Sequence, residues 1–268
     1  MAEKLAILAC DGALPVQLAA AYPDALKLTL TGVPHQLGTG TVEHPIERLG
    51  SVFAALKEAQ VSRLVFAGSL ARPAMDPSAF DEVMIAVAPR LLAAMQQGDD
   101  ALLRQVIALF EEQGVEVVGA HDLLPELTAE EGLAIGPPPT QADLDDAARA
   151  CEILKALSPL DVGQGCAVAG GQCLGIETLQ GTDATLGFVA GTPATLRRGH
   201  KGIYVKAAKA GQDLRIDMPT IGPATIAAVA EAGLAGLMVD AGRVMIVDRN
   251  KTLQAVEDTG IFLIARAL

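Results

Sequence analysis

Leu5-Ala6-Ile7-Leu8-Ala9 is an uninterrupted apolar run that leads through Cys10-Asp11-Gly12-Ala13 into an amphipathic stretch at residues 14–22. A short, wholly apolar run that ends in a turn is typical of a strand buried on both faces. The chain therefore opens with a strand, a loop and a helix. Further apolar runs follow at residues 26–30, 63–67 and 115–118, with helical patterns at 50–60, 77–97 and 99–113 between them. This alternation predicts an α/β fold that begins with a Rossmann-like parallel sheet.

Pro137-Pro138-Pro139 is the clearest break in the chain, because three fixed φ angles and three missing N–H groups exclude both helix and central strand. We predict an N-terminal domain at residues 1–133 and a C-terminal domain at 140–268. The second domain is expected to be mixed α/β, with a hairpin turn at Gly170-Gly171. Its strands are expected at 166–169, 173–176, 203–207, 214–217, 237–239, 244–247 and 262–265, and its helices at 141–157, 223–232 and 251–259. A ligand is expected at the hinge between the two domains.

Charge and composition exclude several classes of protein. The chain has 268 residues, of which 51% are hydrophobic, so it can bury a large core. Its net charge of −12 argues against nucleic-acid binding, which depends on clustered Lys and Arg. The scattered cysteines and the short apolar run at the N-terminus favour a reduced, cytoplasmic setting. Any contact with a membrane is expected to be peripheral.

Polar chemistry is concentrated in the run Arg215-Ile216-Asp217-Met218-Pro219-Thr220-Ile221-Gly222-Pro223. Asp217 is predicted to end a strand at 214–217, and Pro223 is suited to the first turn of a helix, where free N–H groups favour anions. An acidic side chain beside such a site is reasonable if a divalent cation lies between the carboxylate and a phosphate. The alternative is a structural Asp that caps the next helix.

The first domain offers three candidate binding segments. Gly12 lies between the first strand and the first helix, where doubly wound folds bind phosphate, although the GxGxxG pattern is absent. Ser69 and Arg72 follow the strand at 63–67, and Arg72 can form a bidentate contact with phosphate. The alternative for Arg72 is a surface role. Asp99 begins a helix, and its neighbour Asp100 is spaced to form an i,i+4 ion pair with Arg104.

In the second domain, two acids and a hydroxyl follow a predicted strand within a few residues. Glu177 can project from the strand end, and Thr182 or Asp183 can cap a helix or reach a metal. Gln164 precedes the hairpin and can bind a nucleobase or stabilise the turn. Lys206 supplies positive charge suited to phosphate, although most lysines are simply solvated.

Six short segments occur in register over most of the chain. They are Gly12-Ala13-Leu14-Pro15, Phe66-Ala67-Gly68, Gly98-Asp99-Asp100-Ala101-Leu102-Leu103-Arg104, Asp161-Val162-Gly163-Gln164, Gly181-Thr182-Asp183 and Asp217-Met218-Pro219-Thr220-Ile221-Gly222. In this order they resemble the UDP-2,3-diacylglucosamine pyrophosphatase family of lipid A biosynthesis, the type unrelated to the calcineurin-like enzyme. The resemblance implies two α/β domains and hydrolysis of the diphosphate to UMP and 2,3-diacylglucosamine 1-phosphate (lipid X). The loop at Cys10-Asp11 departs from the family pattern.

The resemblance also implies roles for particular residues. Asp217, Asp183 and Thr182 are expected to be catalytic, and Asp217 and Glu177 to hold Mg²⁺ (or Mn²⁺). The residues expected to bind substrate are Gly12, Ser69, Arg72, Asp99, Gln164, Lys206 and Thr220. The acyl chains of such a substrate imply a transient contact with the inner membrane, for which the helix containing Met84 and Met95 is one candidate surface. A homodimer is a further expectation.

Two other classes of function stay open at this stage. A dinucleotide oxidoreductase would fit the strand, turn and helix at the N-terminus, but Thr31-Gly32 offers no ribose-binding acid after the second strand. A non-catalytic nucleotide-sugar binding protein could share the same fold, because fold alone does not determine activity. Ligand binding without turnover would distinguish the second alternative from an enzyme.

Overall fold

The computed structural model describes residues 3–70 and 74–268, which divide into two compact units. Unit 1 comprises the chain up to Pro125 together with Asp213–Asp217. Unit 2 comprises Glu126–Gln212 and Met218–Leu268. The five residues Asp213–Asp217 therefore belong with the N-terminal sheet, although they are flanked in sequence by residues of unit 2.

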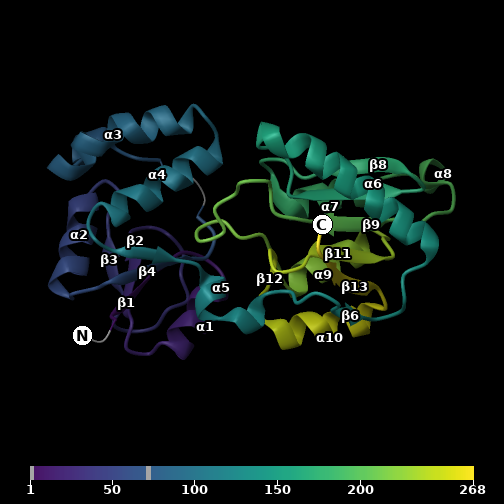
Figure 1. Cartoon of the computed structure of the whole chain (residues 1–268), viewed down its shortest axis with the longest axis horizontal. Coiled ribbons are helices and arrows are strands. Elements are labelled where there is room, and N and C mark those ends of the chain that lie inside the picture. Colours follow the sequence, from purple (N-terminus) through teal and green to yellow (C-terminus); the bar gives the residue numbers. More distant parts are fainter. Residues whose placement is uncertain (1–2, 71–73) are drawn as a thin grey trace. The chain divides into compact units, whose positions relative to one another are not determined.

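Unit 1 is built on a five-stranded sheet in which every pairing is parallel (Figure 1). The strand order is β3-β2-β1-β4-β5. The strands are β1 (Leu5–Ala9), β2 (Leu26–Leu30), β3 (Val42–His44), β4 (Arg63–Ala67) and β5 (Glu116–Val118). This arrangement confirms the predicted parallel sheet. The sequence analysis missed β3. Its first two residues, Val42 and Glu43, are exposed and only one of them is apolar, so the strand contains no continuous apolar run.

The helices of unit 1 alternate with its strands. They are α1 (Leu14–Ala21), α2 (Leu49–Glu58), α3 (Glu82–Met95), α4 (Asp99–Glu111) and α5 (Ala120–Leu123), with a short 3-10 helix η1 (Pro77–Ala79). The predicted break at Gly98 is confirmed, and Gly98 has a φ of 118°. The prediction of one long helix at 77–97 was wrong, because Phe80 has an extended backbone. Helix α3 begins only after Asp81, whose carboxylate accepts a hydrogen bond from the Met84 N–H. Phe110 of α4 packs edge-on against Phe53 and Phe66 in the core.

Unit 2 contains a six-stranded mixed sheet of order β6-β13-β11-β9-β7-β8 and a separate pair, β10-β12. Strands β9, β11 and β13 are parallel, whereas β6, β7 and β8 join antiparallel. This is the mixed α/β domain predicted from the sequence. The strands are β6 (Ala134–Ile135), β7 (Gly165–Ala169), β8 (Gln172–Ile176), β9 (Ile203–Lys206), β10 (Thr220–Ile221), β11 (Gly236–Asp240), β12 (Met245–Ile246) and β13 (Phe262–Arg266).

Helices cover both faces of the unit 2 sheet (Figure 1). On one face, α6 (Gln141–Leu157) buries Ala150 and Leu154 against β7 and β9. On the other, α7 (Gly181–Ala190) and α9 (Pro223–Glu231) bury Leu186 and Ile226. The remaining helices are η2 (Pro125–Leu127), η3 (Ser158–Leu160), α8 (Ala194–Arg197) and α10 (Arg249–Thr259). As predicted, Thr140 caps α6, accepting a hydrogen bond from the Asp143 N–H at 3.2 Å.

The predicted hairpin turn at Gly170-Gly171 is confirmed between β7 and β8. Both glycines have positive φ, at 55° and 74°, as a tight hairpin turn requires. The buried carboxylate of Asp146 in α6 accepts hydrogen bonds from the N–H groups of Gly170 at 2.9 Å and Gly171 at 2.6 Å. The turn is therefore anchored to the helix that covers it.

One sequence expectation needs correction. The strand predicted at 214–217 is wrong: residues 214–216 form a turn, in which the Asp213 carbonyl accepts hydrogen bonds from the Ile216 and Asp217 N–H groups at 3.3 and 3.2 Å. The division between the compact units falls after Pro125, ahead of Pro137–Pro139, because β6 already pairs with β13 in unit 2. None of the helices described for this chain is long and apolar enough to cross a membrane.

Candidate functional site

Two loops of unit 1 meet where the strand order of its sheet reverses. Strands β1 and β4 are neighbours, but β2 lies on one side of β1 and β5 lies beyond β4 on the other. Open parallel sheets bind ligands at the carboxyl ends of strands at such a point. There, the Asp11 N–H donates to the Ser69 carbonyl at 3.2 Å and the Ser69 N–H donates to the Asp11 carbonyl at 2.9 Å. The predicted residues Gly12 and Ser69 are thus brought together.

Glycine is required for this close approach. Gly68 has a φ of +93°, and a Cβ there would lie 2.4 Å from the Asp11 carbonyl oxygen. Gly12 also has positive φ, and its N–H donates to the Asp11 carboxylate at 2.8 Å. Helix α1 starts directly afterwards with no side-chain cap, so its N-terminus opens beside the loop. The predicted contact from Arg72 lies outside the described residues.

The predicted site residue Asp99 lies half-buried in the first turn of α4. Its neighbour Asp100 forms the expected i,i+4 ion pair with Arg104 at 2.5 Å. Asp100 also accepts a hydrogen bond from the Asp213 N–H at 3.4 Å. The start of α4 thus has a structural role, and it contacts the segment that carries Asp217.

Asp217 is held in a turn that is fixed to α4. The Asp213 carboxylate accepts hydrogen bonds from the Arg215 N–H and guanidinium at 2.7 to 3.1 Å, and Arg215 also pairs with Glu111 of α4 at 2.7 Å. The guanidinium of Arg215 lowers the pKa of Asp213 below its usual value. Ile216 packs against the core of unit 1. Asp217 itself is half-buried, and its N–H donates to the Asp213 carbonyl at 3.2 Å.

A buried polar network occupies the corresponding edge of the unit 2 sheet. Glu177 follows β8, and Lys206 ends β9; their side chains are only 11% and 5% exposed. The Lys206 ammonium contacts the two carboxylate oxygens of Glu177 at 3.3 and 3.1 Å. It also donates to the Thr182 hydroxyl at 2.6 Å, and Thr182 donates to Glu177 Oε1 at 3.0 Å. Three predicted site residues therefore form one hydrogen-bonded cluster.

Tyr204 completes the network and was missed by the sequence analysis. Its hydroxyl donates to Glu177 Oε2 at 2.6 Å, and the side chain is fully buried. Tyr204 and Lys206 are two residues apart on β9, so they share a face of the sheet. A Tyr within the apolar run Ile203-Tyr204-Val205 is typical of an ordinary hydrophobic core. The charged Lys206, two residues later on the same strand, was the sequence feature that could have indicated a polar site.

Gly165 makes room for this arrangement. A Cβ at Gly165 would lie 1.7 Å from the Tyr204 hydroxyl oxygen and 2.6 Å from Glu177 Oε2. The Gly165 carbonyl also accepts a hydrogen bond from the Glu177 N–H at 2.8 Å. Gly165, the first residue of β7, therefore binds the backbone of Glu177 and leaves room for its side chain.

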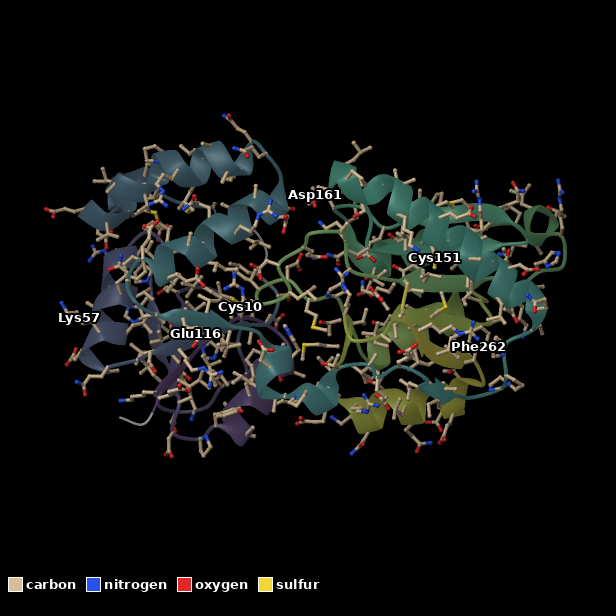
Figure 2. The ribbon with its side chains drawn as sticks, in the orientation of Figure 1. Cys10, Lys57, Glu116, Cys151, Asp161 and Phe262 are labelled. Atoms are coloured by element: carbon tan, nitrogen blue, oxygen red, sulfur yellow. The ribbon has the colours of Figure 1, made fainter. Side chains whose placement is uncertain are left out.

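The remaining predicted residues of unit 2 lie outside this network. Asp183 is exposed on the first turn of α7 and makes none of the network's hydrogen bonds. Gln164 accepts a hydrogen bond at its carbonyl from the Ala207 N–H at 2.8 Å. Thr220 lies in β10, and its hydroxyl donates to the Met218 carbonyl at 3.0 Å. A separate ion pair joins Lys209 to Asp161, a residue labelled in Figure 2.

The surroundings of Glu177 differ from those expected of a magnesium ligand. Glu177 is already bound by an ammonium, a phenol and a threonine hydroxyl, which leaves it poorly suited to act as a Mg²⁺ ligand. Within residues 3–70 and 74–268, three or more His, Cys, Asp or Glu side chains nowhere gather as a metal site would require. These residues do not fit a metal held by protein side chains alone.

Two family models together match nearly the whole chain. Residues 4–127 match the model described as LpxI N-terminal domain, and residues 130–264 match the LpxI C-terminal domain. The chain belongs to the LpxI family. A curated relative, "UDP-2,3-diacylglucosamine pyrophosphatase LpxI" of Caulobacter vibrioides, is 36% identical over 271 aligned residues, which cover 98% of this chain and 97% of the relative. The family expected from the sequence motifs is therefore confirmed.

Proposed function

We propose that this LpxI-family chain is a hydrolase that cleaves the diphosphate of UDP-2,3-diacylglucosamine into UMP and 2,3-diacylglucosamine 1-phosphate, in lipid A biosynthesis. Water adds to one phosphorus, and the bridging P–O bond breaks. The main support is the match over 98% of the chain to a relative that is named for this activity. The polar network of Glu177, Thr182 and Lys206 supports it from the structure, because three of the residues implied by the resemblance converge there.

The network suits the binding of a phosphate oxygen. Lys206 and Thr182 meet at the N-terminal turn of α7, and no side chain caps that helix. A fixed ammonium and a helix N-terminus both favour negative charge, and a buried site strengthens their effect. Glu177 holds the ammonium in place, and the Tyr204 hydroxyl in turn holds the Glu177 carboxylate. Lys206 and Glu177 together carry no net charge, so the N-terminus of α7 supplies the positive potential that a chain charge of −12 makes necessary for a diphosphate substrate.

In unit 1, the loop at Gly12 and Ser69 is proposed to bind the nucleotide end of the substrate. Its position at the reversal of strand order, beside the N-terminus of α1, supports this assignment. Asp217 is proposed to orient the attacking water or to contribute to a metal site. The turn that holds Asp217 is stabilised by Asp213 and Arg215, so its carboxylate is positioned before substrate arrives.

A divalent cation, Mg²⁺ or Mn²⁺, is proposed as a requirement of the reaction. Since the protein provides no three-ligand cluster among its described residues, such an ion would depend on the substrate's diphosphate for much of its coordination. Mg²⁺ is commonly bound in this way, through one or two carboxylates and substrate phosphates. When bound, it would offset negative charge on the diphosphate.

A transient contact with the inner membrane from the cytoplasmic side is also proposed, because the substrate carries acyl chains. The outward surface of α3 supports this idea. Ile85 and Leu92 are 61% and 58% exposed, and they lie on the same face about two helical turns apart. Met95 at the end of the helix is 40% exposed. Homodimer formation is a further proposal, which the measurement of molar mass in solution would test.

The decisive experiment is an assay with the proposed substrate. Metal-stripped protein is incubated with UDP-2,3-diacylglucosamine, with and without Mg²⁺, and UMP and the lipid 1-phosphate are followed by mass spectrometry. The wild type is expected to form both products only with Mg²⁺, and Asp217→Ala is expected to form neither while remaining folded. Asp24→Ala, which removes an exposed acid elsewhere in unit 1, is the matched control.

The assay also tests the alternative function. If the folded wild type binds the nucleotide-sugar but yields no product with any divalent ion, the chain is a binding protein and the proposed hydrolysis is wrong. If Asp217→Ala loses thermal stability, a structural role of this residue in the turn replaces the proposed catalytic one.

A further inference from the structure

Two cysteines of unit 2 lie closer together than their spacing in the sequence suggests. Cys166 in β7 and Cys173 in β8 have their Sγ atoms 3.9 Å apart. Cys173 pairs with Val168 across the hairpin, and Val168 is two residues from Cys166, so both cysteines are on the same face of the sheet. A register shift between Ala167 and Val168 interrupts the regular pairing at this position. The two thiols are therefore in direct contact.

The hairpin holds this contact in place. The turn between the two strands is anchored by Asp146, whose carboxylate binds the N–H groups of Gly170 and Gly171. Strand β7 is buried along its whole length, whereas β8 is the edge strand of the sheet. The Cys166 thiol is consequently fixed in the core, and the Cys173 thiol lies on a strand with one unpaired edge.

The two thiols differ in accessibility in the way a reactive pair requires. Cys166 is completely buried, and Cys173 is exposed. A small oxidant in solvent can thus reach Cys173 directly, whereas Cys166 is shielded by burial.

The electrostatic environment of the two thiols also favours reaction at Cys173. A hydrogen bond from the Cys166 thiol lowers the pKa of Cys173, with the Gly175 N–H and the charge of Arg149 contributing, although partial burial opposes this shift. The same hydrogen bond and burial raise the pKa of Cys166. Thiolates, and not thiols, are the nucleophiles in cysteine oxidation. Cys173 is therefore the sulfur that an oxidant would attack first.

The other two cysteines provide an internal comparison (Figure 2). Burial raises the pKa of Cys10 in unit 1 to about 11, and burial also raises the pKa of Cys151 in unit 2. Both are expected to remain protonated and inert near neutral pH. Any selective reaction of a peroxide with this protein should therefore occur at Cys173.

We propose that Cys166 and Cys173 form an oxidisable dithiol, which hydrogen peroxide converts into a disulfide between β7 and β8. In the first step, the Cys173 thiolate attacks one oxygen of the peroxide, an S–O bond forms, the O–O bond breaks, and hydroxide leaves and is protonated to water. In the second step, Cys166 loses its proton and its sulfur attacks the Cys173 sulfenic acid. The S–S bond forms, the S–O bond breaks, and a second water leaves.

The geometry requires only a modest movement. The sulfurs must approach from 3.9 Å to about 2.05 Å, the length of a disulfide bond. Cys173 lies on an edge strand at an irregular point of the pairing, where a side-chain rotation with a small backbone shift is least restricted. The disulfide would link β7 and β8, which also meet at the polar network. There, at the ends of the strands away from the hairpin turn, the Glu177 N–H donates to the Gly165 carbonyl.

Mass spectrometry of the full-length protein tests the proposal directly. Reduced protein is treated with increasing hydrogen peroxide, alkylated and digested with trypsin without reductant. Residues 156–197 contain both Cys166 and Cys173 and no internal Lys or Arg. A disulfide therefore leaves this one peptide without alkyl groups and two hydrogens lighter than its unalkylated dithiol form. We expect this loss, its reversal by dithiothreitol, and continued alkylation of Cys10 and Cys151 in peptides 5–27 and 150–155.

Variants separate the two steps. Cys173→Ser is expected to abolish the loss of mass, and Cys151→Ser to leave it unchanged. Cys166→Ala is expected to stop at the sulfenic acid of Cys173, which a 1,3-dione reagent traps. In the wild type, Cys173 should alkylate at least about tenfold faster than Cys10 at neutral pH.

Two results would overturn the proposal. The first is a peptide 156–197 of unchanged mass under peroxide, with both cysteines still open to alkylation after unfolding. The second is a disulfide that links two chains through Cys173, seen as a band of twice the mass on a non-reducing gel. If Cys166→Ala fails to fold, the wild-type map and Cys173→Ser still decide the question.

Discussion

The Tyr204 hydroxyl donates a hydrogen bond of 2.6 Å to Oε2 of Glu177, in the interior of unit 2. Burial and the nearby Glu177 carboxylate raise the pKa of Tyr204 well above its usual value, so the phenol keeps its proton and acts as a permanent donor. The other Glu177 oxygen accepts from Thr182, and the Lys206 ammonium contacts both oxygens. Glu177 is therefore a junction that positions Lys206 and Thr182, and a change at Tyr204 acts on them indirectly.

Tyr204→Phe tests this positioning role. The substitution keeps the ring and removes one hydrogen bond to a charged group, so we expect a loss of about 1.5–3 kcal/mol in the free energy of unfolding. Because Lys206 and Thr182 lose a fixed partner, kcat for UMP release should fall clearly, with a smaller change in KM. Steady-state kinetics and urea unfolding provide the two measurements.

Tyr22→Phe is the matched control for Tyr204→Phe. Tyr22 is the other tyrosine of the chain, and its hydroxyl donates to the Leu123 carbonyl at 3.0 Å in unit 1. Its removal is expected to lower stability without changing kcat. Equal kinetic effects of the two substitutions would show that Tyr204 acts through stability alone.

Gly165→Ala should disrupt the same network sterically. The new Cβ would lie 1.7 Å from the Tyr204 hydroxyl oxygen, so Tyr204 or β7 must move. We expect a loss of at least about 1–3 kcal/mol in unfolding free energy, typical of overpacking, together with loss of hydrolysis. Gly187→Ala is the control, because a Cβ there meets no atom within 4 Å and alanine favours the helix. An active, stable Gly165→Ala would show that the observed packing is not required.

Much of the fold could be predicted from local sequence. Strand β1 is a continuous apolar run, β4 is apolar after Arg63, and β2 alternates Leu with Lys27 and Thr29. Helix α6 has the capping residue Thr140 followed by a helical pattern. The segment at 214–217 was misread because its apolar residues resemble a strand, whereas side-chain bonds between Asp213 and Arg215 close a turn. Local patterns do not report such contacts.

The candidate sites were predicted in part. Glu177, Thr182 and Lys206 were singled out by residue type, but the ion pair that unites Glu177 with Lys206 spans 29 positions of the chain. Only the pairing of β7 with both β8 and β9 brings them together. The attachment of Asp217 to unit 1 likewise depends on Arg215 reaching Glu111, which no sequence period predicts.

Gly68→Ala should separate the two loops of unit 1. A Cβ would lie 2.4 Å from the Asp11 carbonyl oxygen, and the φ of +93° is itself unfavourable for alanine. We expect the paired hydrogen bonds between Asp11 and Ser69 to break and the affinity for UMP, measured by calorimetry, to fall at least about tenfold. Gly38→Ala, with ordinary φ and open space, should leave affinity unchanged. Normal UMP binding by Gly68→Ala would remove this loop from the proposed site.

Asp213 should make the stability of unit 1 depend on acid pH. Hydrogen bonds from Arg215 lower the pKa of Asp213, so the folded state binds this proton less readily than the unfolded state does. Its contribution is therefore fully present above the ordinary pKa of 3.8 and is lost as pH falls through the lowered value. Asp213→Asn is expected to cost about 1 kcal/mol at pH 7, a modest figure because Arg215 is 38% exposed and partly screened by solvent.

The difference between wild type and Asp213→Asn should shrink as pH falls below 4, because the wild-type carboxylate then becomes protonated as well. Urea unfolding at pH 7, 5 and 3 measures this convergence. Asp24→Asn, which removes an exposed carboxylate of the same unit, is the matched control. A constant difference between Asp213→Asn and wild type across this range would mean that the turn is stabilised by the shape of the side chain and not by its charge.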